Sequence, residues 1–248
     1  MPAHQDNNLR RAWQQEELGV YLLRGFAAVA HVEASQDVGI DAIATLLRPD
    51  TARRLTAEHS FYVQLKAGSV LSICYKGDEV NWLRGLQLPF FIGSVDPGQS
   101  RLSLYTAHRA MLEVWRSPPP PHIEMRLGER PPQPPESPRS FTDIWLGSPV
   151  LQWTPAEIAK PEFLAHAYSV LKPLLEAEET NIRLRKTGFS YIPTWTTGSP
   201  AFARDWGLKC ALHPQEGLAN IVPELAKAVA ALAVHCCSHG TREEWRQI

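Results

Sequence analysis

The fold of this chain is decided by two short stretches, Asp37-Val38-Gly39-Ile40-Asp41 and Phe61-Tyr62-Val63-Gln64-Leu65-Lys66. The second stretch is rich in β-forming residues and alternates in polarity, which predicts a strand. The first is a turn that leads into residues 40–47, an apolar run typical of a buried strand. Residues 48–60 are polar, and we expect them to connect the two strands.

Polar side chains stand at defined places on these two predicted strands. Gln64 and Lys66 are two residues apart and therefore face the same side of their strand. A lysine on such an apolar strand is costly to bury unless it is paired. Asp41, at the head of the neighbouring strand, is a natural partner. The pattern also fits an ordinary solvated strand face with Asp41 as a turn residue, so both interpretations stay open from spacing alone.

The surrounding sequence predicts further helices and strands. Apolar residues recur at spacings near three and four over residues 9–26, which indicates a helix. Downstream, the expected elements are a strand at 69–76, a helix at 78–85, a strand at 88–95, a turn at 97–100 and a strand at 101–106. This order predicts a mixed sheet with helices packed on it.

Two proline clusters follow, at residues 117–121 and 131–135. We expect the stretch that they bracket to be neither regular helix nor central strand, and interpret it as an extended linker or surface loop. Beyond it, the predicted elements are helix over 155–187 with an interruption near Pro173, a strand within 188–195 and an alanine-rich helix over 222–237. The predicted organisation is a domain at residues 8–116, a proline-rich linker at 117–139 and a mainly helical region at 140–248.

The overall composition limits the classes of function. The 248-residue chain has 25 basic and 26 acidic residues, so any nucleic-acid-binding face must be local or be completed by a partner. No apolar run reaches the roughly 18 residues of a membrane span. Residues 1–13 lack the apolar stretch of a signal peptide. We therefore expect a cytoplasmic protein with no membrane partner, in which the four cysteines are reduced thiols.

Asp41 followed by Gln64-Leu65-Lys66 resembles the PD-(D/E)XK, or restriction-endonuclease-like, nuclease superfamily in its Gln-x-Lys variant. Within this superfamily, the sequence pattern is most similar to that of the family called domain of unknown function 4365. The other matching stretches are Glu16-Glu17-Leu18-Gly19, Asp37 to Asp41, Tyr62 to Lys66, Ile73-Cys74-Tyr75-Lys76, Trp82, and Leu88-Pro89-Phe90-Phe91 running to Asp96. Together they cover about residues 12 to 108, which is less than half of the chain.

This resemblance implies an α/β fold, with a restriction-endonuclease-like mixed β-sheet flanked by helices and a mainly α-helical C-terminal extension. It implies that Asp41 is the principal metal ligand, that Gln64 offers its amide oxygen and that Lys66 is the catalytic lysine. A glutamate on the first helix completes the ion's shell in many members, and here Glu17 and Glu16 both fit. Glu17 lies one turn from Trp13 and Tyr21, so we expect its carboxylate to point toward the packed side of the helix.

The chemistry of phosphodiester cleavage explains this set of residue types. Oxygen ligands hold a divalent ion, which lowers the pKa of a bound water, while a lysine steadies the charge of the transition state. The expected function is therefore a Mg²⁺- or Mn²⁺-dependent endonuclease acting on DNA, as a homodimer or within a larger complex. By analogy, it is a prokaryotic defence nuclease. One alternative is a catalytically inactive nuclease-fold module that binds nucleic acid or a protein partner. Another is an interaction protein in which the proline-rich segment and the helices matter most.

Two clusters in the second half of the chain carry weaker hypotheses. His235 and His239, four residues apart, suggest either a zinc site or an ordinary helix end. An acidic run at residues 176–179 is followed by Arg183, Arg185 and Lys186, which suggests either a solvated helix with ion pairs or a contact with a phosphate backbone.

Overall fold

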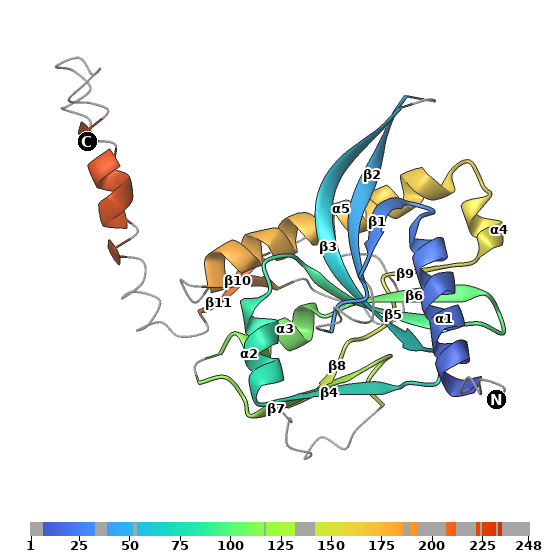
Figure 1. The fold of residues 1–248 in the computed structure, drawn as a ribbon. Helices are drawn as coiled ribbons and strands as arrows, with labels where there is room; N and C mark the ends of the chain where they lie inside the picture. Colours follow the sequence, from blue (N-terminus) through green and yellow to red (C-terminus); the bar gives the residue numbers. More distant parts are fainter. Residues whose placement is uncertain are drawn as a thin grey trace, which may run out of the picture.

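A computed structural model describes residues 7–32, 39–51, 54–116, 118–131, 142–185, 189–192, 207–211, 222–223, 225–231 and 233–234 of the chain. A six-stranded sheet lies at its centre (Figure 1). In spatial order its strands are β1 (Ala27–His31), β2 (Ala42–Thr51), β3 (Arg54–Ala67), β5 (Phe90–Asp96), β6 (Arg101–Thr106) and β9 (Leu151–Trp153). Neighbouring strands are antiparallel except β3 and β5, which are parallel. The expected mixed sheet flanked by helices is confirmed.

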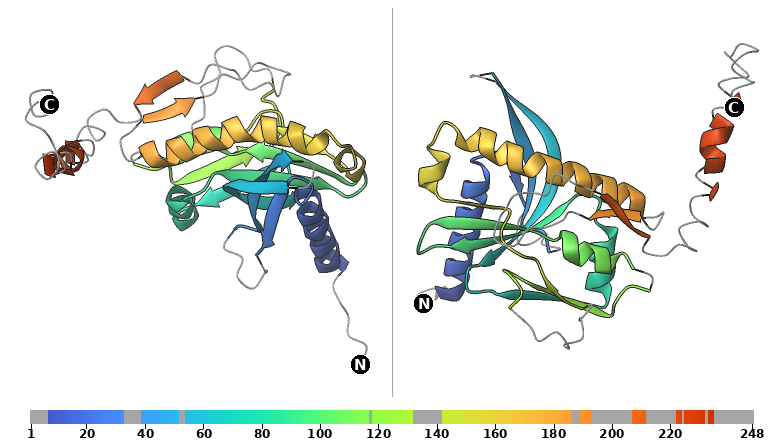
Figure 2. Two further views of the ribbon diagram at one scale, coloured as in Figure 1. Left: turned by 90° about the horizontal axis from the view of Figure 1, so that it is seen from above. Right: turned by 180° about the vertical axis from the view of Figure 1, so that it is seen from behind.

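One apolar core joins this sheet to α1 (Asn7–Leu23) and α5 (Phe163–Leu184). Successive strand residues point to opposite faces, and Val63 and Leu65 enter this core with Leu102 and Leu104. The ring nitrogen of Trp153 donates a hydrogen bond of 2.9 Å to the carbonyl oxygen of Leu22 at the end of α1. Figure 2 shows α5 lying across one face of the main sheet.

The strand residues that point the other way enter a second core. Ile92 and Phe90 meet Leu83 of α2 (Asp78–Gly85), Met111 of α3 (His108–Val114) and Met125 of a three-stranded sheet. The strands of that sheet are β4 (Ser72–Lys76), β7 (His122–Arg126) and β8 (Asp143–Trp145), with β7 in the middle. The main sheet is therefore covered over much of both faces.

The remaining elements are short. The helix α4 (Pro155–Ile158) begins with a capping box between Thr154 and Glu157. β10 (Phe189–Ile192) and β11 (Gly207–Ala211) form a two-stranded sheet, in agreement with the strand expected within residues 188–195. Residues 222–223, 225–231 and 233–234 are helical, as expected, whereas residues 235–239 lie outside the described ranges. No helix among the described residues is long and apolar enough to cross a membrane.

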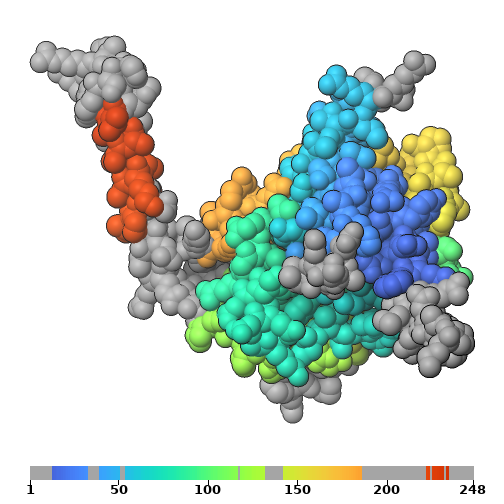
Figure 3. Space-filling model, viewed as in Figure 1, coloured from blue at the N-terminus to red at the C-terminus, as the bar shows by residue number. Residues whose placement is uncertain are grey.

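The expectation that residues 48–60 form a connecting segment is wrong. β2 and β3 pair almost to their tips, from Ala42 opposite Val63 to Thr51 opposite Arg54. The resulting hairpin arm, residues 45–51 and 54–60, projects beyond the surrounding surface (Figure 3). Its polar side chains serve a contact with α5, because the Tyr168 hydroxyl donates to Glu58 at 2.6 Å and His59 contacts Glu179 at 2.9 Å.

The proline clusters also do not prevent a central strand. β7 lies between β4 and β8, although residues 118–121 immediately before it are all proline. The five residues of the strand contain no proline, so every backbone N–H remains available for the ladder. The prolines end where the strand begins.

The expected boundary at residue 116, with a linker to 139 and a separate helical region, does not match the packing. β9 pairs with β6, and Leu171, Leu174 and Leu175 of α5 fill the first core. Nor is α5 interrupted at Pro173. That residue lies on the exposed side, where water can bind the backbone carbonyl that loses its donor. The elements β7, β8, β9 and α5 therefore complete the fold that begins at α1.

Candidate functional site

Asp41, Gln64 and Lys66 are brought together at the junction of β2 and β3. Asp41 precedes the first residue of β2, and its N–H donates to the carbonyl oxygen of Val63 at 3.0 Å. Its carboxylate oxygen Oδ2 accepts the N–H of Leu65 at 2.5 Å. Leu65 stands between Gln64 and Lys66 in the chain, so the carboxylate lies against the peptide bond that joins Gln64 to Leu65.

The two residues before Asp41, Gly39 and Ile40, set this position. Gly39 has a φ of 88°, in the left-handed region that favours glycine, and a Cβ there would lie 3.1 Å from the ring of Trp82. Ile40 then enters the second core beside Tyr75. Gly39 and Ile40 thus fix where the chain enters β2, and with it the direction of the Asp41 side chain.

Gln64 is buried, with 6% of its surface exposed. Its amide oxygen Oε1 accepts a hydrogen bond of 2.5 Å from the hydroxyl of Tyr75 on β4. Burial raises the pKa of Tyr75 above its usual range, and the nearby carboxylates of Asp41 and Glu79 raise it further. Tyr75 is therefore a protonated donor at neutral pH, and the amide oxygen of Gln64 keeps one lone pair for another contact.

Lys66 is half-buried and lies opposite Ser94 in the parallel pairing of β3 and β5. No hydrogen bond or ion pair from another described residue reaches its ammonium group. The strand pattern suggested a pairing of Lys66 with Asp41, but no ion pair within 4.0 Å joins the two side chains. Oδ2 of Asp41 accepts a backbone N–H instead.

The two helix glutamates differ in position. Glu17 is exposed, as are Trp13 and Tyr21 on the same side of α1, with 53% and 54% of their surfaces accessible. The expectation that Glu17 points toward the packed side is wrong, because the buried stripe of α1 runs through Gly19, Val20, Leu22 and Leu23. Glu16 is half-buried and contacts His31 at 2.5 Å. His31 pairs with Ala42, the neighbour of Asp41.

The structure thus joins Asp41, Gln64 and Lys66, brings Glu16 to the adjoining strand end and leaves Glu17 on the outer surface. Among the described residues, no group of three or more histidine, cysteine, aspartate or glutamate side chains is arranged to hold a metal ion. A divalent ion here would have one carboxylate and one neutral amide oxygen from the two strands. Both are oxygen donors of the kind that Mg²⁺ takes in proteins.

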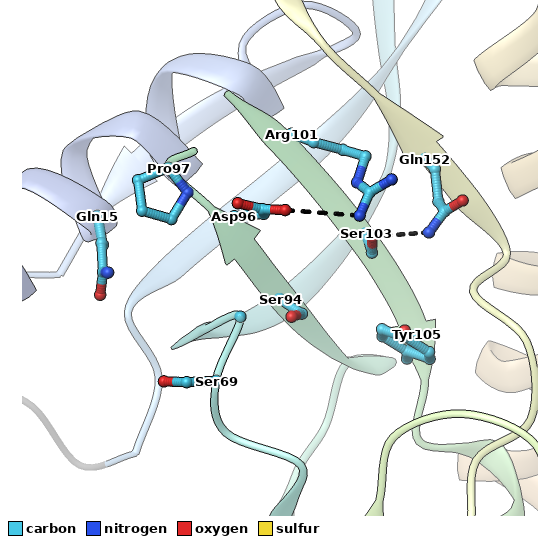
Figure 4. Close-up of a pocket in the computed structure, with 10 residues that line it drawn as sticks. Gln15, Ser69, Ser94, Asp96, Pro97, Arg101, Ser103, Tyr105 and Gln152 are labelled. Atoms are coloured by element: carbon cyan, nitrogen blue, oxygen red, sulfur yellow. Dashed lines mark hydrogen bonds and ion pairs between the residues drawn. The ribbon is translucent and has the colours of Figure 1, made fainter. Parts of the chain in front are cut away.

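A pocket of about 470 Å³ includes Ser94, the strand partner of Lys66, in its lining and therefore adjoins this site. Figure 4 shows its lining residues. Its lining residues are Gln15, Gly68, Ser69, Ser94, Asp96, Pro97, Arg101, Ser103, Tyr105 and Gln152. Strand pairing sets Lys66 beside Ser94, Ser94 beside Ser103, and Ser103 beside Gln152. The amide nitrogen of Gln152 donates to the Ser103 hydroxyl at 2.9 Å.

Sequence reasoning identified neither Tyr75 as the partner of Gln64 nor the polar lining of the pocket. The available signal was the alternation of residues 101–106, where Arg101, Ser103 and Tyr105 share one face between buried leucines. Arg185, a candidate for a phosphate contact, instead donates to the carbonyl oxygens of Leu86 and Arg84 at 2.6 and 3.0 Å.

No protein-family model, curated protein or solved structure significantly matches this chain.

Proposed function

We propose that this chain is a metal-dependent endonuclease that hydrolyses DNA phosphodiester bonds, with Asp41, Gln64 and Lys66 at its reaction centre. The observation that carries the proposal is the 2.5 Å hydrogen bond from the Leu65 N–H to Asp41 Oδ2. This bond joins residues 24 positions apart in the chain and sets the Asp41 carboxylate beside the segment that contains Gln64 and Lys66, the residues on which the Gln-x-Lys resemblance rests. The restriction-endonuclease-like character of the sheet is part of this proposal.

In this proposal Asp41 and Gln64 hold the ion, which when bound supplies a water of lowered pKa and offsets charge on the phosphate. These residues would bring one negative charge from the protein, so they would hold Mg²⁺ weakly. Tyr75 fixes the direction of the Gln64 amide oxygen. Glu16, rather than Glu17, is the helix carboxylate disposed to assist, through its position beside His31 and β1.

Lys66 has the second role in the reaction. Its ammonium group has no competing carboxylate among the described residues, and it lies one residue beyond the peptide that contacts Asp41. A lysine in this state can offset charge that develops on the phosphate oxygens in the transition state. DNA and a second copy of this chain are the proposed partners, since two strands require two sites, and defence against foreign DNA is the proposed setting.

The alternative is a nuclease-fold module that binds nucleic acid or a protein without cleaving. One specific observation favours it: the Gln64 amide oxygen already accepts the Tyr75 hydroxyl, and no acidic cluster completes the site among the described residues. Such a module keeps Lys66 for a phosphate contact and has no resident ion.

Incubation with plasmid DNA and with RNA, in Mg²⁺ or Mn²⁺, tests the proposal. Wild type is expected to nick or linearise the plasmid, and Asp41→Asn and Lys66→Ala to lose this activity at least 100-fold. Lys76→Ala is the matched control, because Lys76 is an exposed lysine of β4. DNA binding without cleavage in either metal would support the alternative. Cleavage that persists in Asp41→Asn would overturn the proposed centre.

A further inference from the structure

The pocket beside Lys66 has a distinctive chemistry. Its side chains offer four hydroxyl groups and two amides, and its only charged lining residues are Asp96 and Arg101. These two form an ion pair at 3.6 Å, as drawn in Figure 4. The lining is therefore polar and close to neutral, with many hydrogen-bond donors and acceptors. Its volume of about 470 Å³ lies within the range of small-ligand sites.

This lining does not suit a phosphate group. A phosphate binds where donors and uncompensated positive charge converge. Here the single cation already has a carboxylate partner, and the Asp96 carboxylate also accepts the N–H groups of Gly98 and Gln99. An uncharged polar ligand meets no such opposing charge.

One atom in the pocket wall lacks a partner. Arg101 Nε is buried, and no described residue accepts its hydrogen bond. A water-sized group in the pocket does not reach that atom. A ring nitrogen or a carbonyl oxygen of a ligand would instead accept from the lining hydroxyls and from the second N–H of the Gln152 amide. Nucleobases carry both kinds of acceptor on their edges.

The distance from Lys66 fits the same ligand. Ser94, Ser103 and Gln152 follow Lys66 across successive strands in one row. Neighbouring strands lie about 4.8 Å apart, so the row extends about 5 to 15 Å from Lys66. A nucleotide whose phosphate lies at Lys66 would direct its base into this row.

We propose that the pocket binds the base of an unstacked nucleotide adjacent to the cleaved phosphate, and that the substrate is single-stranded or locally unpaired DNA. Only the location of the cleaved bond rests on the proposed function. A base inside the pocket cannot remain stacked in a duplex, and unstacking costs least where the base is already unpaired, so unpaired DNA is the preferred substrate. Tyr105 offers a ring for stacking, and the Gln152 amide and Arg101 offer donors to base edges.

Titration of the full chain with the four 2′-deoxynucleosides, followed by ¹H–¹⁵N NMR, tests the pocket without any cleavage step. Nucleoside binding is expected to weaken about five-fold in Gln152→Ala, through loss of one hydrogen bond. It should be unchanged in Lys66→Ala and in Gln87→Ala, an exposed glutamine outside the pocket lining. Gln152 is exposed at the pocket rim, so its replacement is not expected to disturb folding.

Binding of inorganic phosphate but of no nucleoside would overturn the proposal, as would equal nucleoside binding by wild type and Gln152→Ala. Cleavage assays on matched single-stranded and duplex oligonucleotides separate this result from the fate of the nuclease proposal. Gln152-dependent nucleoside binding without cleavage would retain the pocket and remove the nuclease. Cleavage that prefers paired duplex, with the same KM in Gln152→Ala, would retain the nuclease and remove the pocket.

Discussion

A fragment that ends at Arg116 is expected not to fold, although it contains the whole predicted nuclease domain. Residues after Arg116 supply seven large apolar side chains to the first core, namely Val150, Leu151, Trp153, Phe163, Leu171, Leu174 and Leu175. Burying one such side chain contributes about 1.5–3 kcal/mol, so the seven together contribute about 10–20 kcal/mol as an upper bound.

Removal of these residues also removes the entropic cost of ordering them. The side chains that they cover, such as Phe26 and Leu46, gain no such compensation when they are exposed to water. If exposure of the apolar side chains that remain in the fragment costs half of the upper bound, the fragment loses about 5–10 kcal/mol of stability. Domains are stable by only about 5–15 kcal/mol in total, so the loss matches the whole stability of the fold.

Thermal denaturation followed by near-ultraviolet circular dichroism, together with amide dispersion in NMR, measures the outcome. The control fragment ends at Arg185 and keeps β9, α5 and the three-stranded sheet, so it is expected to melt cooperatively. A sigmoidal melt and dispersed amide signals from the fragment that ends at Arg116 would refute the reasoning, because they would require a self-sufficient core within residues 7–116.

Three further perturbations test particular contacts. Tyr75→Phe removes the hydroxyl donor to buried Gln64 and should lower the free energy of unfolding by about 1–2 kcal/mol in urea titration, whereas a change below 0.5 kcal/mol would contradict the bond. Gly19→Val places a Cβ 2.8 Å from a β3 leucine and should cost about 1–3 kcal/mol, measured as a lower Tm. Burial and the hydrogen bond to Glu58 raise the pKa of Tyr168 to about 12, so its contribution to stability is complete below pH 10 and is lost as the pH rises through 12. A pH-independent difference between wild type and Tyr168→Phe across that interval would disprove this linkage.

Elements specified by local periodicity could be predicted from the sequence. The helix expected at residues 78–85 is α2 from Asp78 to Gly85, because both its acidic first turn and its apolar spacing lie within eight residues. The hairpin arm could not be predicted in the same way. Its polar residues look like a loop, and only the partners on α5, such as Tyr168 110 residues from Glu58, explain them as strand residues.

In the candidate site, too, local contacts could be predicted from the sequence and long-range contacts could not. Asp41 and Gln64 could be placed together because one hairpin register joins their strands. Tyr75 could not be assigned to Gln64, since β4 belongs to the three-stranded sheet, and no local pattern indicates that this sheet packs against the main one. The Ser103–Gln152 pair joins residues 49 positions apart on strands whose adjacency no local pattern encodes. The misplacement of Glu17 has a different origin: Trp13 and Tyr21 are apolar and yet exposed, so hydrophobic spacing pointed to the wrong side of α1.

The hydrogen bond from Trp153 to Leu22 has a consequence for how the chain is made. Its partners are 131 residues apart, so the last strand of the sheet leaves the ribosome long after the first helix. At about 5–20 residues per second, synthesis of the intervening segment takes roughly 7–26 s. During that time the apolar side of α1 and the first strands lack the residues that bury them in the finished fold. Pairing between residues so far apart in the chain also forms slowly. A chaperone would therefore act during synthesis, by keeping the nascent chain soluble, and not on the stability of the finished protein.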